Sequence, residues 1–294
     1  MYVYDLSRCP ASFDFLNWLA ICATHAQGEF HVSILRGPKD GFRDDELEPQ
    51  DWEVRRQMLD NVLIPATRLW NVKSLTLFPK AVSGKRPHYN VNELYIGQPI
   101  PSLKVPEWAL RIVRQRYPKP PVVVPLRTPG HHPSRNSNQE EWQKACARLR
   151  FDLGEKVVLV PDVIEPWMSD YDIFYEGINL LLRAALYQHA KCVLGVNHGP
   201  QAALAGLNAR CRYLTFKMLA PTPATTMEWF AMLGYAGTDY MWAYPWQHLV
   251  WEPDNADTII EAYQALPEKT EEHDYFPAVK WATPSKNLQR SSSS

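Results

Sequence analysis

The segment with the clearest chemical potential is the turn that follows the short strand expected at Lys191–Gly195. The turn contains Asn197, His198, Gly199, Pro200 and Gln201, and small residues continue the segment to Leu207. Pro suits the first turn of a helix, and the small residues allow close packing on a sheet. The N-terminus of such a helix has free backbone N–H groups and a positive dipole end, which favour a phosphate or diphosphate. An ordinary connection between strand and helix is the alternative interpretation.

Two arginines lie in another connection of the same kind. Arg127 ends the apolar strand expected at Pro121–Leu126, and Arg135 lies in the loop before the helix expected at Gln139–Leu149. A guanidinium group offers a planar fork of donors that matches phosphate oxygens. The pair could therefore stabilise the charge that develops on a departing diphosphate. A salt bridge at the surface or between domains is the alternative for each arginine.

Three carboxylates follow expected strands. Asp162 and Glu165 come after the strand at Lys156–Val160, and Asp40 lies in the loop after Phe30–Leu35. Ligands of parallel sheets bind beyond the carboxyl ends of the strands. We expect Asp162 and Glu165 to accept hydrogen bonds from a ribose or sugar hydroxyl, and Asp40 to act as a base toward an acceptor hydroxyl. Solvated loop acids or helix caps are the alternatives.

The elements that must position these residues form two successive series of strands and helices. Apolar runs predict strands at 1–6, 30–35 and 74–78, and then at 121–126, 156–160, 191–195 and 212–216. Amphipathic stretches predict the helices between them, at 13–26, 51–64, 139–149, 179–189 and 201–207. This alternation predicts an α/β protein with two Rossmann-like, doubly wound domains that face a cleft. Pro65 is expected to end or kink its helix.

A proline-rich stretch marks the boundary between the two series. The periodicity fades from Pro79 to Pro121, apart from one basic helix at Val105–Tyr117. The expected domains are residues 1–118 and residues 119–265, followed by a tail over residues 266–294. In a group-transfer reaction, the first domain would bind the acceptor of the group and the second domain would bind its donor. The helix around Ala256–Leu266 is expected to cross back onto the first domain.

The second series resembles the C-terminal half of GT-B-type glycosyltransferases, in their heptosyltransferase-like and fucosyltransferase-like branches. The resemblance is carried by residues 183–200, which end in Gly195-Val-Asn-His-Gly-Pro200, and by Tyr213–Phe216. It implies that the strand, the Gly-Pro turn and the following helix hold the diphosphate of the donor. The loop from Arg127 to Ser137 is similar in placement to the basic loop that such enzymes aim at the donor phosphates. The resemblance covers residues 119–265, and residues 1–118 only by architecture.

Several other classes of protein lack support in the sequence. The 31 basic and 32 acidic residues leave a net charge of −1, which gives no sign of a nucleic-acid partner. No apolar run approaches the roughly 18 residues that span a bilayer, and a cytoplasmic protein is expected. The basic helix at 105–117 could touch an acidic membrane surface, but a solvated face is favoured. None of the 5 cysteines is spaced as CxxC, and neither His131-His132 nor the acidic triplet Asp170–Asp172 predicts a metal site.

These observations predict a metal-independent glycosyltransferase with no cofactor. Its donor would be a nucleotide-activated sugar, and its acceptor a glycan or another hydroxyl compound. Arg127, Arg135 and the turn at 197–201 would hold the diphosphate, and Asp40 would deprotonate the acceptor. A nucleotide-sugar epimerase or hydrolase on the same fold, which forms product without an acceptor, stays an alternative. So does a non-catalytic nucleotide- or sugar-binding protein, which the glycine-poor first half favours.

Overall fold

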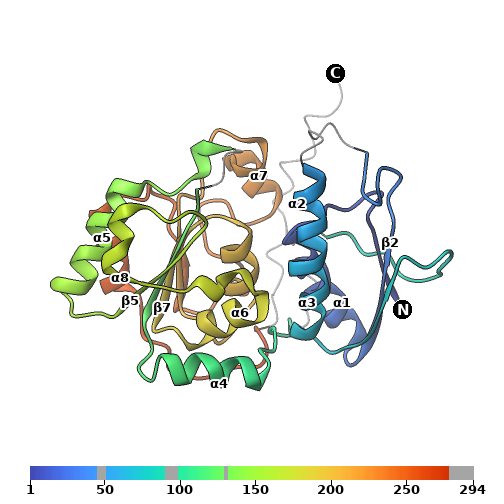
Figure 1. The fold of residues 1–294 in the computed structure, drawn as a ribbon, viewed down its shortest axis with the longest axis horizontal. Helices are drawn as coiled ribbons and strands as arrows, with labels where there is room; N and C mark the ends of the chain where they lie inside the picture. The colour runs from blue at the N-terminus through green and yellow to red at the C-terminus, as the bar shows by residue number, and fades with distance from the viewer. Residues whose placement is uncertain (45–50, 90–98, 129–131, 278–294) are drawn as a thin grey trace, which may run out of the picture.

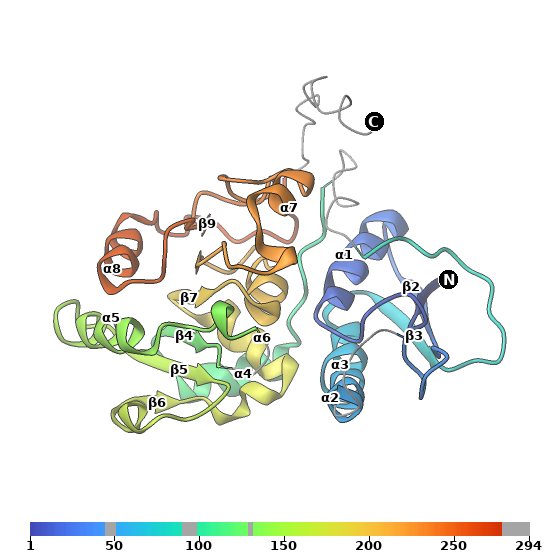
Figure 2. The same cartoon turned by 90° about the horizontal axis from the view of Figure 1, so that it is seen from above.

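The computed structural model describes residues 1–44, 51–89, 99–128 and 132–277. Within these ranges the chain forms two parallel β-sheets, one of three strands and one of six. The two sheets and their helices lie side by side as two halves of the molecule (Figures 1 and 2). The predicted fold class, an α/β protein with two Rossmann-like layers, is therefore confirmed.

The N-terminal half carries the sheet β1-β2-β3, with strands at Tyr2–Asp5, Phe30–Leu35 and Val72–Leu77. Helix α1 (Asp14–Ala26) connects β1 to β2, and α2 (Asp51–Met58) begins the return to β3. The helix does not end at Pro65, because a π-helical turn, η1 (Leu59–Leu63), precedes it and the chain continues through α3 (Ile64–Ala66) and η2 (Thr67–Leu69). A wider turn relieves the clash between a proline ring and the carbonyl four residues earlier.

The C-terminal half carries the sheet β6-β5-β4-β7-β8-β9. Its strands are β4 (Val122–Leu126), β5 (Val157–Pro161), β6 (Asp172–Ile173), β7 (Cys192–Val196), β8 (Tyr213–Phe216) and β9 (Gln247–Leu249), all paired in parallel. Alternate residues of β4 face opposite sides. Val122 and Val124 pack under α5 (Gln139–Phe151) and α8 (Ala256–Ala265), whereas Val123 belongs to the core around α4 (Glu107–Arg116) and α6 (Leu180–His189).

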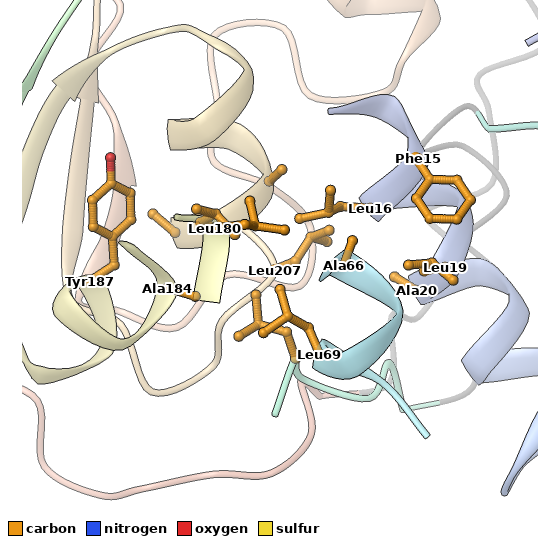
Figure 3. Packing of buried hydrophobic residues seen from close by; sticks show 14 of the residues in the cluster. Phe15, Leu16, Leu19, Ala20, Ala66, Leu69, Leu180, Ala184, Tyr187 and Leu207 are labelled. Atoms are coloured by element: carbon orange, nitrogen blue, oxygen red, sulfur yellow. The ribbon is translucent and has the colours of Figure 1, made fainter. Parts of the chain in front are cut away.

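One apolar core joins the two halves. Its buried residues come from both sheets, from α1 and α3 on one side and from α6 on the other. Figure 3 shows Leu16 and Ala66 of the N-terminal half pointing toward Leu180 and Leu207 of the C-terminal half. This contact fixes the distance between the two sheets, and hence the width of any site between them.

The segments outside the two sheets also link the halves. Helix α4 packs against α6, beside the second sheet. Helix α8 packs against α5 of its own half, so the prediction that residues 256–266 cross back onto the first domain is wrong. The later residues make the return instead, because Phe276 N–H donates to the Ile100 carbonyl at 2.8 Å and Ser102 N–H donates to Asp274 at 2.9 Å. In the part of the chain that the structure describes, every helix is too short or too polar to cross a membrane.

Candidate functional site

A cavity of about 1210 Å³ lies between the two halves. We call it the interdomain cavity. It is bounded by the first turn of α1 and by α2 on the N-terminal side, and by the carboxyl ends of β4, β5 and β7 on the other. Among the described lining residues the charged side chains are Arg127, Arg135, Arg183, Asp14 and Asp162. Three guanidinium groups against two carboxylates make this cavity suited to an anionic ligand.

Asp14 is the carboxylate of the N-terminal half that lines the interdomain cavity. It lies in the first turn of α1, and its Oδ2 accepts a hydrogen bond from Ser12 Oγ at 2.8 Å. Burial raises the pKa of Asp14, while the Ser12 hydrogen bond and the charges of Arg43 and Arg135 oppose that rise. Arg135 lines the same cavity from the C-terminal half. A cavity carboxylate with a raised pKa is a candidate general base.

Asp40, the base predicted from the sequence, does not line the cavity. It is exposed in a tight turn in which Gly37 N–H donates to the Gly41 carbonyl at 2.8 Å. Asp40 and Gly41 both have positive φ values, 47° and 96°, which belong to this tight turn. Among the described residues of the N-terminal half, Asp14 and not Asp40 is the carboxylate that lines the cavity.

Arg127 and Arg135 both line the cavity, and the loop that carries them is fixed at several points. Arg127 Nη1 donates to the His132 carbonyl at 3.3 Å and to Asn136 Oδ1. Arg135 Nη2 donates to the Asn197 carbonyl at 3.2 Å, which ties this loop to the turn after β7. Arg135 Nε is buried without a hydrogen-bond partner in the described residues. A ligand oxygen would satisfy such a donor.

Asp254 anchors the far end of this loop, and no pattern in the sequence predicts that role. The side chain is buried, and its Oδ2 accepts hydrogen bonds from Asn138 N–H at 2.8 Å and from Trp142 Nε1 at 2.9 Å. Lys217 Nζ reaches both Asp254, at 3.7 Å, and the Asn136 carbonyl, at 2.6 Å. These contacts hold the arginine loop in place before any ligand binds.

The turn after β7 contributes most of its predicted residues to the cavity. Asn197, His198, Gly199 and Pro200 line it. Gly199 lies against Phe13 of the other half, and a Cβ atom there would stand 2.8 Å from the phenylalanine ring. Only glycine allows this close approach.

Gln201 is not a lining residue. It is fully buried, and its Nε2 donates to the Leu214 carbonyl at 3.1 Å and to Thr215 Oγ1 at 3.2 Å. The helix expected at 201–207 is a short π-helical turn, η7 (Gln201–Ala205). The charge that would hold an anion therefore comes from the arginines.

The two predicted acids after β5 differ in position. Asp162 lines the cavity, and its Oδ2 accepts a hydrogen bond from Thr128 N–H at 3.2 Å. Glu165 is not among the lining residues, and it precedes the 3₁₀ turn at Pro166–Asp170. His131 lies outside the described residues, and those residues contain no group of three side chains that could hold a metal ion.

His198 makes the stability of the fold sensitive to acid. Burial and the charge of Arg183 lower its pKa to about 3, from an ordinary value of 6.5. Between these values the unfolded chain binds a proton that the folded chain does not, so stability falls as pH falls through this window. We expect the free energy of unfolding of wild type to decrease, relative to that of His198→Gln, by roughly 1.4 kcal/mol per pH unit below pH 6. Urea unfolding at pH 7.5, 6 and 5 measures this, and parallel curves for the two proteins would contradict it.

Comparison with known proteins gives similarity of structure only. No protein-family model matches the chain, and no curated protein matches its sequence. E. coli heptosyltransferase WaaC with ADP-2-deoxy-2-fluoro heptose matches with a TM-score of 0.44 and 12% identity, over 90% of this chain and 99% of that one. The glycosyl transferase family 9 structure from Veillonella parvula gives 0.44 and 10%, over 90% and 96%. E. coli ADP-heptose LPS heptosyltransferase II gives 0.41 and 11%, over 76% and 86%. The chain is thus structurally similar to family 9 heptosyltransferases, which are GT-B glycosyltransferases, at low sequence identity.

Proposed function

We propose that this protein transfers a sugar from a nucleoside-diphosphate donor to an acceptor hydroxyl in the interdomain cavity. The observation that carries the proposal is a single cavity that Asp14 lines from the N-terminal half and Arg135 lines from the C-terminal half. One wall offers a base and the other offers fixed positive charge. Displacement at an anomeric carbon needs both, because a proton leaves the acceptor while negative charge develops on the departing diphosphate.

The reaction follows from these positions. Asp14 takes the proton of the acceptor hydroxyl as its oxygen forms a bond to the anomeric carbon. The bond between that carbon and the diphosphate oxygen breaks, and the electron pair leaves with the nucleoside diphosphate. Arg135 and Arg127 donate hydrogen bonds to the diphosphate, and the buried Nε of Arg135 gains a partner. The loop contacts to Asp254 and Asn197 hold the guanidinium groups in place, so little reorganisation is needed during the step.

Each half would bind one of the two substrates. The diphosphate would lie against the C-terminal half, where the arginines are, and the acceptor would approach from the side of α1. The structure of WaaC contains an ADP-activated heptose analogue, so ADP-sugars belong in the set of donors to be tested beside UDP-, GDP- and CMP-sugars.

Release of nucleotide from sugar donors tests the activity. Each nucleotide sugar is incubated with the protein, with and without a mixture of glycan acceptors, and the free nucleotide is quantified. We expect one donor to release its nucleoside diphosphate faster when acceptor is present. Equal release without acceptor would indicate a hydrolase, and a changed sugar without release would indicate an epimerase. Binding with no turnover of any donor would contradict transfer and indicate a binding protein.

A further inference from the structure

Arg183 is a buried cation in the interdomain cavity that the proposed reaction does not use. It lies on α6, one turn before Tyr187, whose ring is labelled in Figure 3. The side chain lines the cavity but is only 9% exposed. Its Nε donates to the Tyr187 hydroxyl at 3.0 Å, whereas Nη2 is buried and has no hydrogen-bond partner in the described residues. A buried donor without an acceptor is costly, and such groups call for a ligand or a water.

His198 provides a buried hydrogen-bond acceptor that has no donor. It lines the same cavity and is 5% exposed. Its Nδ1 lies 2.7 Å from the Val196 carbonyl oxygen. Because a carbonyl only accepts, Nδ1 must carry the proton, and Nε2 must present a lone pair. Nε2 is also buried without a partner in the described residues. Burial lowers the pKa of His198 to about 3, so the ring stays neutral at physiological pH and Nε2 stays an acceptor.

The two side chains come from elements that pack together. Helix α6, which carries Arg183, packs against η7, and Ala202 N–H of η7 donates to the His198 carbonyl at 2.9 Å. The pair therefore places an unused N–H donor and an unused acceptor on one wall of the cavity. A phosphate or carboxylate oxygen could only accept, and it would meet the lone pair of His198 unfavourably. A hydroxyl group can accept from one side and donate to the other, which satisfies both atoms at once.

We infer that Arg183 and His198 form a hydroxyl-recognition subsite, in which one ligand hydroxyl accepts from the Arg183 guanidinium and donates to His198 Nε2. The inference rests on the proposed function, since Arg127 and Arg135 of the same cavity take the diphosphate. The hydroxyl then belongs to a sugar ring on one side of that diphosphate. The ring is either the ribose of the nucleotide or the sugar to be transferred, and both carry the same chemistry.

Titration calorimetry with the full chain separates these sources. The first ligands are UDP, GDP and ADP. The nucleotide that binds is then compared with its 2′-deoxy and 3′-deoxy forms and with its nucleotide sugars. The variants are His198→Gln and Arg183→Gln, with His189→Gln as the matched control. His189 lies on α6 outside the cavity lining, and its Nε2 is 2.6 Å from the Tyr117 carbonyl oxygen. If the hydroxyl is on the ribose, wild type is expected to bind one deoxynucleotide about tenfold to a hundredfold more weakly than the parent nucleotide. In His198→Gln and Arg183→Gln that discrimination shrinks to less than about threefold, and in His189→Gln it persists.

If the hydroxyl is on the transferred sugar, the deoxynucleotides bind wild type like the parent. The same two substitutions then weaken the nucleotide sugar about tenfold or more and leave the free nucleotide unchanged. Either pattern supports the subsite. The subsite is overturned if the two substitutions weaken the binding of every ligand equally, or if they weaken the binding of no ligand. The proposed function would still stand in that case if nucleotide binding depends on Arg135. Two results on wild type alone would also overturn the subsite when they occur together. They are that both deoxynucleotides bind as tightly as the parent nucleotide, and that the nucleotide sugar binds no more tightly than the free nucleotide. Absence of any nucleotide binding rejects the proposed function itself, and the subsite with it.

Discussion

Replacement of Asp14 by asparagine is expected to lower kcat for sugar transfer by about 10²–10⁴-fold and to leave nucleotide binding intact. Asparagine keeps the size of the side chain and can still accept the hydrogen bond that Ser12 Oγ makes to Asp14. It cannot take a proton from an acceptor hydroxyl. Transfer kinetics and nucleotide affinity, measured on the same preparation, separate the loss of the base from the loss of the site.

The matched control is Asp40→Asn. Asp40 is an exposed carboxylate of the same half, in a turn away from the cavity lining, and its replacement is expected to leave kcat unchanged. The stability of the Asp14→Asn variant provides a second control. Burial raises the pKa of Asp14, so the ionised form is disfavoured in the folded state, and the resulting loss of stability is present at neutral pH. Asp14→Asn removes that loss and should not unfold the protein. A variant that keeps wild-type kcat would remove Asp14 from the mechanism.

Replacement of Leu16 by alanine is expected to lower the free energy of unfolding by about 2–5 kcal/mol. Leu16 is fully buried in the core that joins the two halves, and it points toward Leu180 and Leu207 (Figure 3). Its truncation leaves a cavity between layers that cannot close without moving the sheets. The matched control is Leu77→Ala, because Leu77 is 40% exposed on β3 and should change stability by roughly 0.5 kcal/mol.

Denaturant unfolding of the Leu16→Ala variant also reports on how the halves are coupled. Because the core draws buried residues from both sheets, we expect a single transition that shifts as a whole for the entire chain. Two separated transitions, of which only the first shifts in Leu16→Ala, would mean that the halves are stable independently. The interdomain cavity would then have no fixed width.

The sequence was most informative where local pattern decides structure. Apolar, β-branched runs such as Val122–Leu126 and Val157–Pro161 are buried on both faces of a parallel sheet, so their composition alone predicts strands. The strands that went unpredicted, β6 and β9, have only two and three residues. They exist because a neighbouring strand supplies hydrogen bonds, and no run of that length carries a signal of its own.

The site was predictable only in part, for a different reason. Arg127 and Arg135 could be found, because arginines in a loop after an apolar strand are visible in one segment of the chain. Asp14 was missed because an acid in the first turn of a helix has an ordinary explanation, namely its favourable interaction with the helix dipole. What distinguishes Asp14 is that it lines the same cavity as Arg135 of the other half. Two segments so far apart in the sequence do not reveal that they meet. Arg183 is hidden in the same way within an apolar helix.

The most direct test of the central claim is the thermal stability of the protein with a panel of nucleotides and nucleotide sugars, for wild type and for Arg135→Ala. Ligand at about 100 times its dissociation constant adds roughly 2.7 kcal/mol to the stability of the folded state, which raises Tm by roughly 5 °C in a chain of this size. We expect such a shift with one diphosphate nucleotide and its sugar conjugates, and its loss in Arg135→Ala. No shift with any nucleotide, or an equal shift in the variant, would contradict the assignment of the interdomain cavity as a donor site.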